Sequence, residues 1–414
     1  MSFFIGAATA AHQTEGNNLF SDCWAMEQMA CSPFREPSLT AVDHYHRFEE
    51  DIRLLAQAGL NTYRFSVEWA RIEPQEGKFN EDEINHYKNV LDACRRFGVE
   101  PIVTMHHFPS PKWLIERGGW ESEDTATYFA RYCAFVAERL GNRMKYVCTI
   151  NEANMGRQIA ALSKKAASGG ALQIGIDLDE IRSRAKWTAE ENRRVFGTAE
   201  PAVFLSARSE CGNRVILSAH CRAREEMKRI CPHLRIGLTL SLHDIQAAEG
   251  GERAAAAAWD DEFSWCLPAI LDDDFIGVQN YTRTVYGPQG ELPVPEDAEK
   301  TQMGYEFYPD ALGNVIRRVY REAKLPVLVT ENGVATENDG RRCLFMERAL
   351  QGVRQCCEEG IPIIGYLHWS LLDNFEWQKG YGMKFGLIAV DRTNMKRAPK
   401  QSLFALGAFT RSMV

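Results

Sequence analysis

Short apolar runs, each followed by polar or aromatic residues, recur along the chain and are mostly separated by stretches with helical periodicity. Runs of this length are typical of buried strands, and their alternation with helices favours a parallel α/β sheet. Eight such units are enough to close a single (β/α)8 TIM barrel, which we expect here, with an open doubly wound sheet as the alternative. The expected strands are residues 3–8, 62–67, 101–106, 146–150, 235–240, 275–280, 327–330 and 363–368.

Helical periodicity is clearest after Thr40, where apolar residues recur three or four positions apart until Gly59. An alanine run at residues 254–258 also favours a helix, because alanine has the highest helix propensity. Similar patterns predict helices over residues 81–97, 125–140, 178–196, 214–230, 310–323 and 347–359.

Two connections are much longer than the roughly two to six residues common between a strand and a helix. Residues 153–212 form a long insertion, and residues 287–304 are rich in proline and acidic side chains. Both follow expected strands, so we expect them over the carboxyl end of the barrel, where the active sites of such barrels lie. Because no repeat or low-complexity linker interrupts the chain, we expect residues 1–414 to form a single domain.

Bulk composition excludes several kinds of partner. The formal net charge of −8 argues against nucleic acid and against an anionic membrane, since both require a basic surface. No apolar run approaches the roughly 18 residues of a membrane span, and no signal-peptide pattern opens the sequence, so we expect a cytoplasmic protein. The 12 cysteines have no CxxC or Cys/His metal spacing, which predicts free thiols in a reducing compartment and no metal site.

Two glutamates stand at the ends of expected strands. Glu331 closes the run that begins at Val327, and Glu152 follows the run at residues 146–150. Because the carboxyl ends of parallel barrel strands meet at one face, we expect these side chains to share a site. Paired carboxylates favour glycoside hydrolysis as the leading chemistry.

Polar and aromatic clusters that can hold a sugar follow most of the expected strands. Amides, carboxylates and imidazoles bond sugar hydroxyls, while tryptophan faces stack on C–H surfaces. The clusters are Ala11-His12-Gln13-Thr14-Glu15-Gly16, Arg64 with Glu68-Trp69, His106-His107-Phe108, Asn280-Tyr281-Thr282-Arg283 and the segment 368–377. The chain also contains the motifs Gly6-Ala7-Ala8-Thr9-Ala10 with Gln13 and Glu15-Gly16, Tyr63-Arg64-Phe65-Ser66-Val67-Glu68-Trp69, Thr149-Ile150-Asn151-Glu152, Thr330-Glu331-Asn332-Gly333, the segment 369–377, and Phe385-Gly386. In this order, from about residue 3 to residue 400, the chain resembles glycoside hydrolase family 1, the β-glucosidase and β-galactosidase family of (β/α)8 barrels.

The resemblance implies a retaining mechanism with two glutamates in different roles. Glu331 matches the nucleophile, held in its ionised form by Arg64 and hydrogen-bonded by Tyr281. Glu152 matches the acid/base, which must first be protonated and later accept a proton from water. Asn151 matches the residue that bonds the sugar 2-hydroxyl. Such a mechanism predicts carboxyl groups roughly 5 to 5.5 Å apart.

The resemblance also implies which residues bind the sugar. Gln13, His107, Glu376 and Trp377 match the glycone-binding set, and Trp369 matches the aromatic platform beneath the ring. Glu376 favours an unphosphorylated glycone, because a carboxylate near O4 and O6 would repel a phosphate. The carboxylates carry the chemistry, so neither a metal nor an organic cofactor is implied.

Five features depart from the family pattern. Gln279-Asn280-Tyr281 stands where the family usually has Asn-Tyr-Tyr, and Phe108 replaces the tryptophan that commonly follows His107. Ala153 replaces the proline that usually follows the acid/base. The connection 240–274 is shorter than is typical, and 153–212 is longer. These differences leave the aglycone open. The glucoside or galactoside preference is open because both sugars present O4 and O6 to Glu376, and the sequence does not determine the oligomeric state.

The sequence therefore predicts a retaining exo-β-glycosidase that acts on small glycosides or oligosaccharides with a terminal β-glucosyl, β-galactosyl or β-fucosyl residue. Three alternatives remain at this point: a transglycosylase of the same fold, a 6-phospho-β-glycosidase, and a catalytically silent carbohydrate-binding protein. The presence of both glutamates argues against the silent binding protein.

Overall fold

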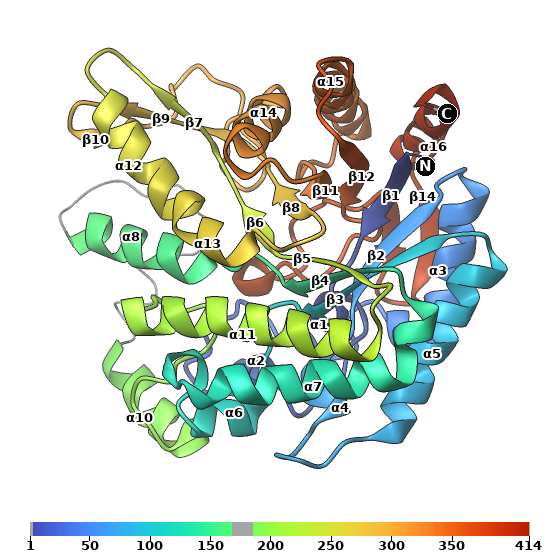
Figure 1. Cartoon of the computed structure of the whole chain (residues 1–414), viewed down its shortest axis with the longest axis vertical. Helices are drawn as coiled ribbons and strands as arrows, with labels where there is room; N and C mark the ends of the chain where they lie inside the picture. The colour runs from blue at the N-terminus through green and yellow to red at the C-terminus, as the bar shows by residue number, and fades with distance from the viewer. Residues whose placement is uncertain (1–2, 168–184, 414) are drawn as a thin grey trace.

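The computed structural model describes residues 3–413 except 168–184, and its centre is a parallel barrel (Figure 1). The sheet order is β5-β4-β3-β2-β1-β12-β11-β8-β6, and β1 pairs in parallel with both β2 and β12. The TIM barrel predicted from the alternating pattern is confirmed. Its strands are β1 (Phe4–Ala8), β2 (Thr62–Ser66), β3 (Glu100–His106), β4 (Tyr146–Ile150), β5 (Arg235–Gly237), β6 (Thr239–Ser241), β8 (Ile276–Gln279), β11 (Val327–Asn332) and β12 (Ile363–Trp369).

The fifth strand, predicted as one run over residues 235–240, is divided at Leu238 into β5 and β6. The backbone N–H of Leu238 donates to the carboxylate of Asp273 (2.9 Å), and that of Ile236 donates to Asp274 (2.8 Å). Side-chain acceptors thus replace strand carbonyls at these positions. Because β5 pairs with β4 while β6 pairs with β8, the barrel closes through the two halves of this strand.

Helices surround the barrel in Figure 1. Their buried apolar residues share one hydrophobic core with the strands. Polar side chains cap several of them: Asn80, Ser209 and Asn338 accept from the first turns of α5, α11 and α15. The longer helices are α3 (His44–Gln57), α5 (Glu81–Arg96), α7 (Asp124–Leu140), α8 (Met155–Ala167), α10 (Ala185–Phe196), α11 (Glu210–Ile230), α12 (Glu252–Glu262), α14 (Ala311–Ala323), α15 (Asp339–Glu358) and α16 (Gln401–Met413).

Shorter helical segments lie in the connections. They are α1 (Ala11–Thr14), α2 (Asp22–Glu27), α4 (Trp69–Ile72), α6 (Lys112–Glu116), α13 (Leu267–Ile270) and 3-10 turns at Gly119–Glu121, Gly141–Arg143, Ser264–Cys266 and Trp377–Lys379. The helix predicted over residues 178–196 begins outside the described residues, and its described part is α10.

A second, three-stranded sheet lies beside the barrel and was not anticipated from the sequence. It joins β7 (Asp244–Ala247), β9 (Arg283–Gly287) and β10 (Gly290–Glu291), so part of the proline-rich connection forms a hairpin. A separate hairpin pairs β13 (Ile388–Asp391) with β14 (Lys396–Pro399). Among the described residues, no helix has the length and apolar character that a membrane crossing requires.

Candidate active site

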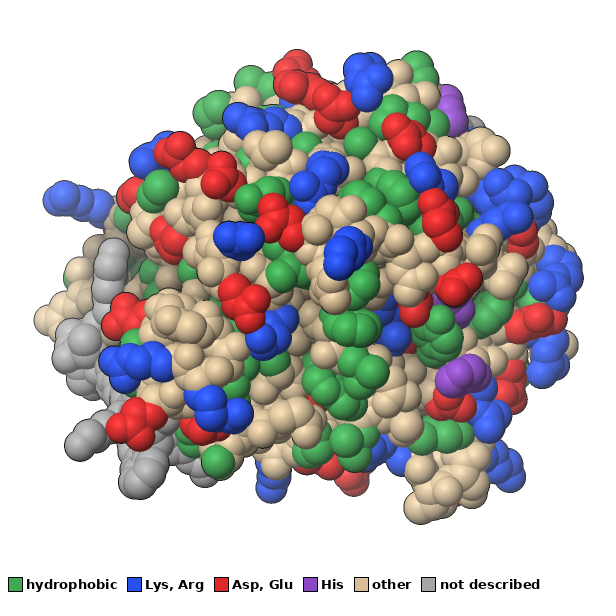
Figure 2. All heavy atoms as spheres, turned by 90° about the horizontal axis from the view of Figure 1, so that it is seen from below, with side chains coloured by type: hydrophobic (Ala, Val, Ile, Leu, Met, Phe, Trp, Pro, Cys, Tyr) green, Lys and Arg blue, Asp and Glu red, His purple; other side chains and the backbone are tan. Residues whose placement is uncertain are grey.

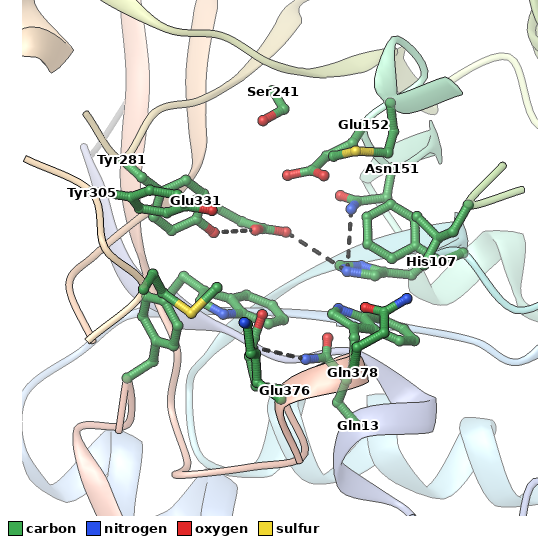
Figure 3. A pocket seen from close by; sticks show the side chains of 18 residues that line it. Gln13, His107, Asn151, Glu152, Ser241, Tyr281, Tyr305, Glu331, Glu376 and Gln378 are labelled. Atoms are coloured by element: carbon green, nitrogen blue, oxygen red, sulfur yellow. Dashed lines mark hydrogen bonds and ion pairs between the residues drawn. The ribbon is translucent and has the colours of Figure 1, made fainter. Parts of the chain in front are cut away.

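A pocket opens at the carboxyl ends of the barrel strands (Figure 3). Every site residue predicted from the sequence lines this pocket except Arg64, which is buried beneath it. The predicted residues in its wall are Gln13, His107, Asn151, Glu152, Tyr281, Glu331, Trp369, Glu376 and Trp377. Residues more than 350 positions apart in the sequence therefore meet because parallel strands end at the same face.

Glu331 lies near the end of β11 with both carboxylate oxygens engaged. Its Oε1 accepts from Arg64 (2.6 Å) and from the side-chain amide of Gln279 (3.1 Å), while its Oε2 accepts from the hydroxyl of Tyr281 (2.6 Å). Arg64 is fully buried, so its charge acts on Glu331 with little screening by water. This environment favours the ionised carboxylate.

Glu152 directly follows β4 and has a left-handed backbone conformation, with φ of 44°. Its backbone N–H donates to the hydroxyl of Thr239 (3.2 Å), which fixes this unusual turn against β6. Its carboxyl is buried, and the hydroxyl of Ser241 is its hydrogen-bonding neighbour. In contrast to Glu331, it has no cation in direct contact within the described part of the chain.

These environments separate the acidities of the two glutamates. Burial raises the pKa of Glu152 well above its ordinary value, and the negative charge of Glu331 raises it further. Burial also raises the pKa of Glu331, but Arg64 and the hydroxyl of Tyr281 oppose that rise. Glu331 therefore ionises first, and the proton of the pair stays on Glu152.

Asn151 is oriented by donors on one side and by His107 on the other. Its Oδ1 accepts from Arg64 (2.6 Å) and Gln279 (2.6 Å), so its Nδ2 is the atom that faces Nε2 of His107 (3.1 Å). Burial lowers the pKa of His107 well below its ordinary value, and nearby Arg64 lowers it further. The neutral imidazole can accept this hydrogen bond at Nε2, which places its own proton on Nδ1.

The opposite wall combines an amide, a carboxyl and two indoles. Nε2 of Gln13 donates to the carbonyl of Phe375 (2.8 Å) and lies 3.5 Å from Oε2 of Glu376. Figure 3 shows Gln13 and Glu376 side by side in this wall. Burial raises the pKa of Glu376 to about 8, with a contribution from Glu331. The ring of Trp369 stacks on that of His107, with centroids 5.6 Å apart. The wall therefore offers hydrogen-bonding groups beside flat apolar faces, as sugar binding requires.

A family model described as Glycosyl hydrolase family 1 matches residues 1–303 and 288–411. The chain belongs to this family. It is accordingly a glycoside hydrolase, as the motifs predicted. Two solved structures agree: beta-glycosidase BGL167 has a TM-score of 0.90 and 47% identity, covering 99% of this chain and 96% of its own. A beta-glucosidase designated 1317 has a TM-score of 0.91 and 40% identity, covering 99% and 98%.

Curated relatives of this family 1 chain include enzymes with different substrates. The beta-glucosidase of Agrobacterium sp. (strain ATCC 21400) is 28% identical over 457 residues, which cover 97% of this chain and 92% of the relative. The aryl-phospho-beta-D-glucosidase BglC of Bacillus subtilis (strain 168) is 28% identical over 491 residues, covering 97% and 95%. Equal identity to both leaves the phosphorylation of the glycone to be decided by other means.

Several residues in the pocket wall of this family 1 enzyme were not among the predicted site residues. Met155, Leu205 and Met303 come from the two long connections, so these connections do reach the carboxyl end of the barrel as predicted, and Tyr305 directly follows the second connection. Apolar residues in loops carry no periodic signal, which is why their place in the wall was not predicted. The remaining additions are Phe108, Ser241, Gln378, Lys379 and Phe385.

Other polar residues noted in the sequence have structural contacts instead. Glu68 caps α4 through the backbone N–H of Ala70, and the indole of Trp69 donates to Glu73 (2.8 Å). The side chain of Trp187, in the insertion, lies outside what the structure describes. Within the described residues, no three side chains of His, Cys, Asp or Glu are arranged to hold a metal ion.

Proposed function

We propose that this chain is a retaining β-glycosidase that hydrolyses terminal, unphosphorylated β-glucosyl residues of small glycosides. One observation carries the proposal: two buried carboxyls share one pocket, and only Glu331 has Arg64 and Tyr281 in direct contact. A nucleophile must be ionised and a general acid must be protonated, and these neighbours favour that division. The printed names of its relatives, several of them beta-glucosidases, point to the same substrate class.

In the first step, a carboxylate oxygen of Glu331 attacks the anomeric carbon and the glycosidic C–O bond breaks. Glu152 transfers its proton to the departing oxygen, so the alcohol leaves uncharged. In the second step, Glu152 accepts a proton from water, whose oxygen attacks the same carbon and displaces Glu331. Two inversions give a sugar with retained configuration, and the mechanism predicts carboxyl groups roughly 5 to 5.5 Å apart.

The remaining predicted residues bind the sugar in this proposal. Asn151 donates through Nδ2 to the 2-hydroxyl, a contact that strengthens as positive charge develops on the ring. Gln13, His107 and Glu376 bond the other hydroxyls, while Trp369 and Trp377 contact the apolar faces. We also propose that the chain acts as a single barrel domain in the cytoplasm, where its twelve free thiols would stay reduced.

The phosphorylation state of the glycone needs a direct test. A charged Glu376 would repel a 6-phosphate, but its pKa of about 8 means that this charge is incomplete at neutral pH. Lys379 lines the same pocket, and the Bacillus subtilis relative is named for a phosphorylated substrate. We therefore propose the unphosphorylated sugar chiefly from the Gln13–Glu376 pair, whose hydrogen-bonding atoms suit neutral hydroxyls.

Initial rates on chromogenic β-glucoside, β-galactoside, β-fucoside, α-glucoside and 6-phospho-β-glucoside test the proposal. We expect turnover of the unphosphorylated β-sugars only, with the β-anomer appearing first by proton NMR. A first-formed α-anomer would refute retention, and preference for the phosphorylated sugar would refute the glycone assignment.

Two alternatives are separated by further measurements. Product analysis at high concentrations of an acceptor alcohol measures transglycosylation against hydrolysis. Glu331→Ala should abolish turnover and leave binding of the sugar largely intact; unchanged turnover would refute the assignment of Glu331. A folded wild-type protein that binds sugar but turns over none of the panel would be a carbohydrate-binding protein.

A further inference from the structure

Gln279 is the last residue of β8, and its side chain is fully buried. In the sequence it is notable only as a departure from the family pattern. In the structure it lies behind the pocket wall, between the carboxylate of Glu331 and the amide of Asn151. Its position raises the question of what this amide does for the two residues.

A single nitrogen of Gln279 contacts both neighbours. Nε2 donates to Oδ1 of Asn151 (2.6 Å) and to Oε1 of Glu331 (3.1 Å). Arg64 donates to the same two oxygen atoms, through Nη2 and Nη1, each at 2.6 Å. The two oxygens are therefore held from two directions, by a guanidinium on β2 and by an amide on β8.

The strand register explains why residue 279 can reach both groups. On β8, Gln279 is the partner of Glu331 on β11 and of Ser241 on β6. The β11–β8 register shifts between Val329 and Glu331, which brings the glutamate opposite the end of β8. The barrel strands thus fix the backbone of each residue, and the amide of Gln279 orients the side chains of Glu331 and Asn151.

The orientation of the amide is determined by its surroundings. Both near neighbours are acceptors, so the nitrogen must face them and Oε1 must point away. Oε1 is buried and has no hydrogen-bonding partner among the described residues. Burying an amide with one unpaired atom costs free energy. Its two donor contacts, to Asn151 and Glu331, offset part of that cost.

We propose that Gln279 is a positioning residue that couples the nucleophile to the amide that binds the sugar 2-hydroxyl. By donating to Glu331 it stabilises the ionised carboxylate, and by donating to Asn151 it turns Nδ2 of that residue toward the sugar. The inference rests on the proposed function, because it assigns Gln279 a part in that same reaction.

Gln279→Met tests the proposal, since methionine keeps the length and volume of the side chain and removes the donor. We expect kcat/KM on a β-glucoside to fall about 10- to 100-fold, the loss typical of removed hydrogen bonds to a charged group. On the matching 2-deoxy-β-glucoside the loss should be smaller, because the Asn151 contact is then absent from both proteins. Gln279→Asn, with a shorter amide, should retain more activity than Gln279→Met.

The acidity of Glu331 provides a readout that does not require turnover. A donor to the ionised form lowers a pKa, so its removal should raise the pKa of Glu331. Carbon-13 NMR titration of labelled glutamate carboxyls should show this rise in Gln279→Met. The control is Thr330→Val, which removes a buried hydroxyl bonded to the carbonyl of Val278 and should leave the titration unchanged.

Equal kinetics of wild type and Gln279→Met, or an unchanged titration of Glu331, would overturn the role proposed for Gln279 while leaving the proposed glycosidase activity intact. An equal loss on both sugars would also overturn it, since that would indicate a general structural effect. A wild-type protein inactive on the whole panel would instead refute the proposed function, and the titration would still decide whether Gln279 acts on Glu331.

Discussion

At the scale of single residues, identical side chains acquire different chemistry from their neighbours. Glu331 has three donors on its carboxylate, whereas Glu152 has a hydroxyl and a nearby negative charge. The structure therefore ranks the two acidities without any difference in residue type. This ranking is what a retaining glycosidase would need at neutral pH.

The ranking predicts the pH dependence of kcat/KM. Activity should fall in acid as Glu331 is protonated, and should fall in base as Glu152 loses its proton. Both limbs should lie above the ordinary glutamate range, because burial raises the pKa of both groups. A bell-shaped profile measured on a β-glucoside checks this, and its two apparent pKa values belong to the pair.

Glu152→Gln tests the assignment of Glu152 as the general acid, because glutamine keeps the shape of the glutamate side chain and cannot donate the acidic proton. We expect kcat/KM to fall about 100- to 10,000-fold on substrates with poor leaving groups. With a dinitrophenol leaving group, kcat/KM should fall much less. The basic limb attributed to Glu152 should disappear with the activated substrate. An unchanged basic limb would contradict the assignment of Glu152 as the acid.

At the scale of elements, Asp273 binds the backbone at Leu238, where the fifth strand divides into β5 and β6. Its carboxylate accepts from the backbone of Leu238, from His220 (3.0 Å) and from Arg224, and its side chain is fully buried. Asp273→Ala would leave Arg224 and His220 without this buried partner. We expect the free energy of unfolding to fall by about 3–5 kcal/mol.

Asp272→Ala is the control for this change, since the neighbouring side chain is 88% exposed and lies 3.6 Å from the same arginine. Thermal or urea unfolding of the two variants should show a large loss for the first and no measurable change for the second. Similar losses in both would indicate that charge near Arg224, rather than the buried contacts, stabilises the strand break.

Elements with strong periodicity were predictable from the sequence, and the exceptions have identifiable reasons. All eight expected strands form, but the division at Leu238 depends on aspartates 35 or more residues later, which no local pattern reveals. Helix α15 begins at Asp339, earlier than the predicted residue 347, because its polar first turns resemble a loop. The β7–β9–β10 sheet escaped prediction because β7 pairs with β9, which follows α12, α13 and β8 in the sequence.

The site was predictable to a similar degree. Glu331 was singled out by its place at the end of an expected strand, and Tyr281 by the resemblance to family 1; the structure brings both to one pocket. Gln279 was not identified, because its contacts depend on the register of neighbouring strands. The loop residues Met155 and Met303 likewise acquire a place in the wall only through the path of the connections.

At the scale of the whole molecule, exposed and buried ion pairs differ in how strongly their loss affects stability. Figure 2 shows acidic and basic side chains interspersed over one face, in keeping with a net charge of only −8. Such exposed pairs contribute little to stability. Removing one partner of a buried pair costs more, because it leaves the other charge buried without compensation. One such pair joins the first third of the chain to its C-terminal hairpin.

That pair is Asp51 on α3 and Arg397 on β14, linked by two hydrogen bonds of 2.8 Å each. His44 adds a third contact to the carboxylate of Asp51 (2.8 Å). Burial alone would raise the pKa of Asp51, but Arg397 and His44 hold it below its ordinary value. This bidentate contact links the β13–β14 hairpin to α3, a helix between β1 and β2.

Arg397→Met should therefore destabilise the whole fold, since it leaves the Asp51 carboxylate buried with only His44. We expect the free energy of unfolding to fall by about 3–5 kcal/mol at pH 7. The control is Lys396→Ala, an exposed residue of the same hairpin, for which we expect no measurable change.

Because the folded pKa of Asp51 is depressed, its stabilising contribution is complete above the unfolded value near 3.9 and is lost as the pH falls through the folded value. The difference between wild type and Arg397→Met in urea unfolding should thus be largest near neutral pH and shrink below about pH 4. A difference that stays constant into acid would mean that Arg397 stabilises the hairpin by packing, and not by holding the charge of Asp51.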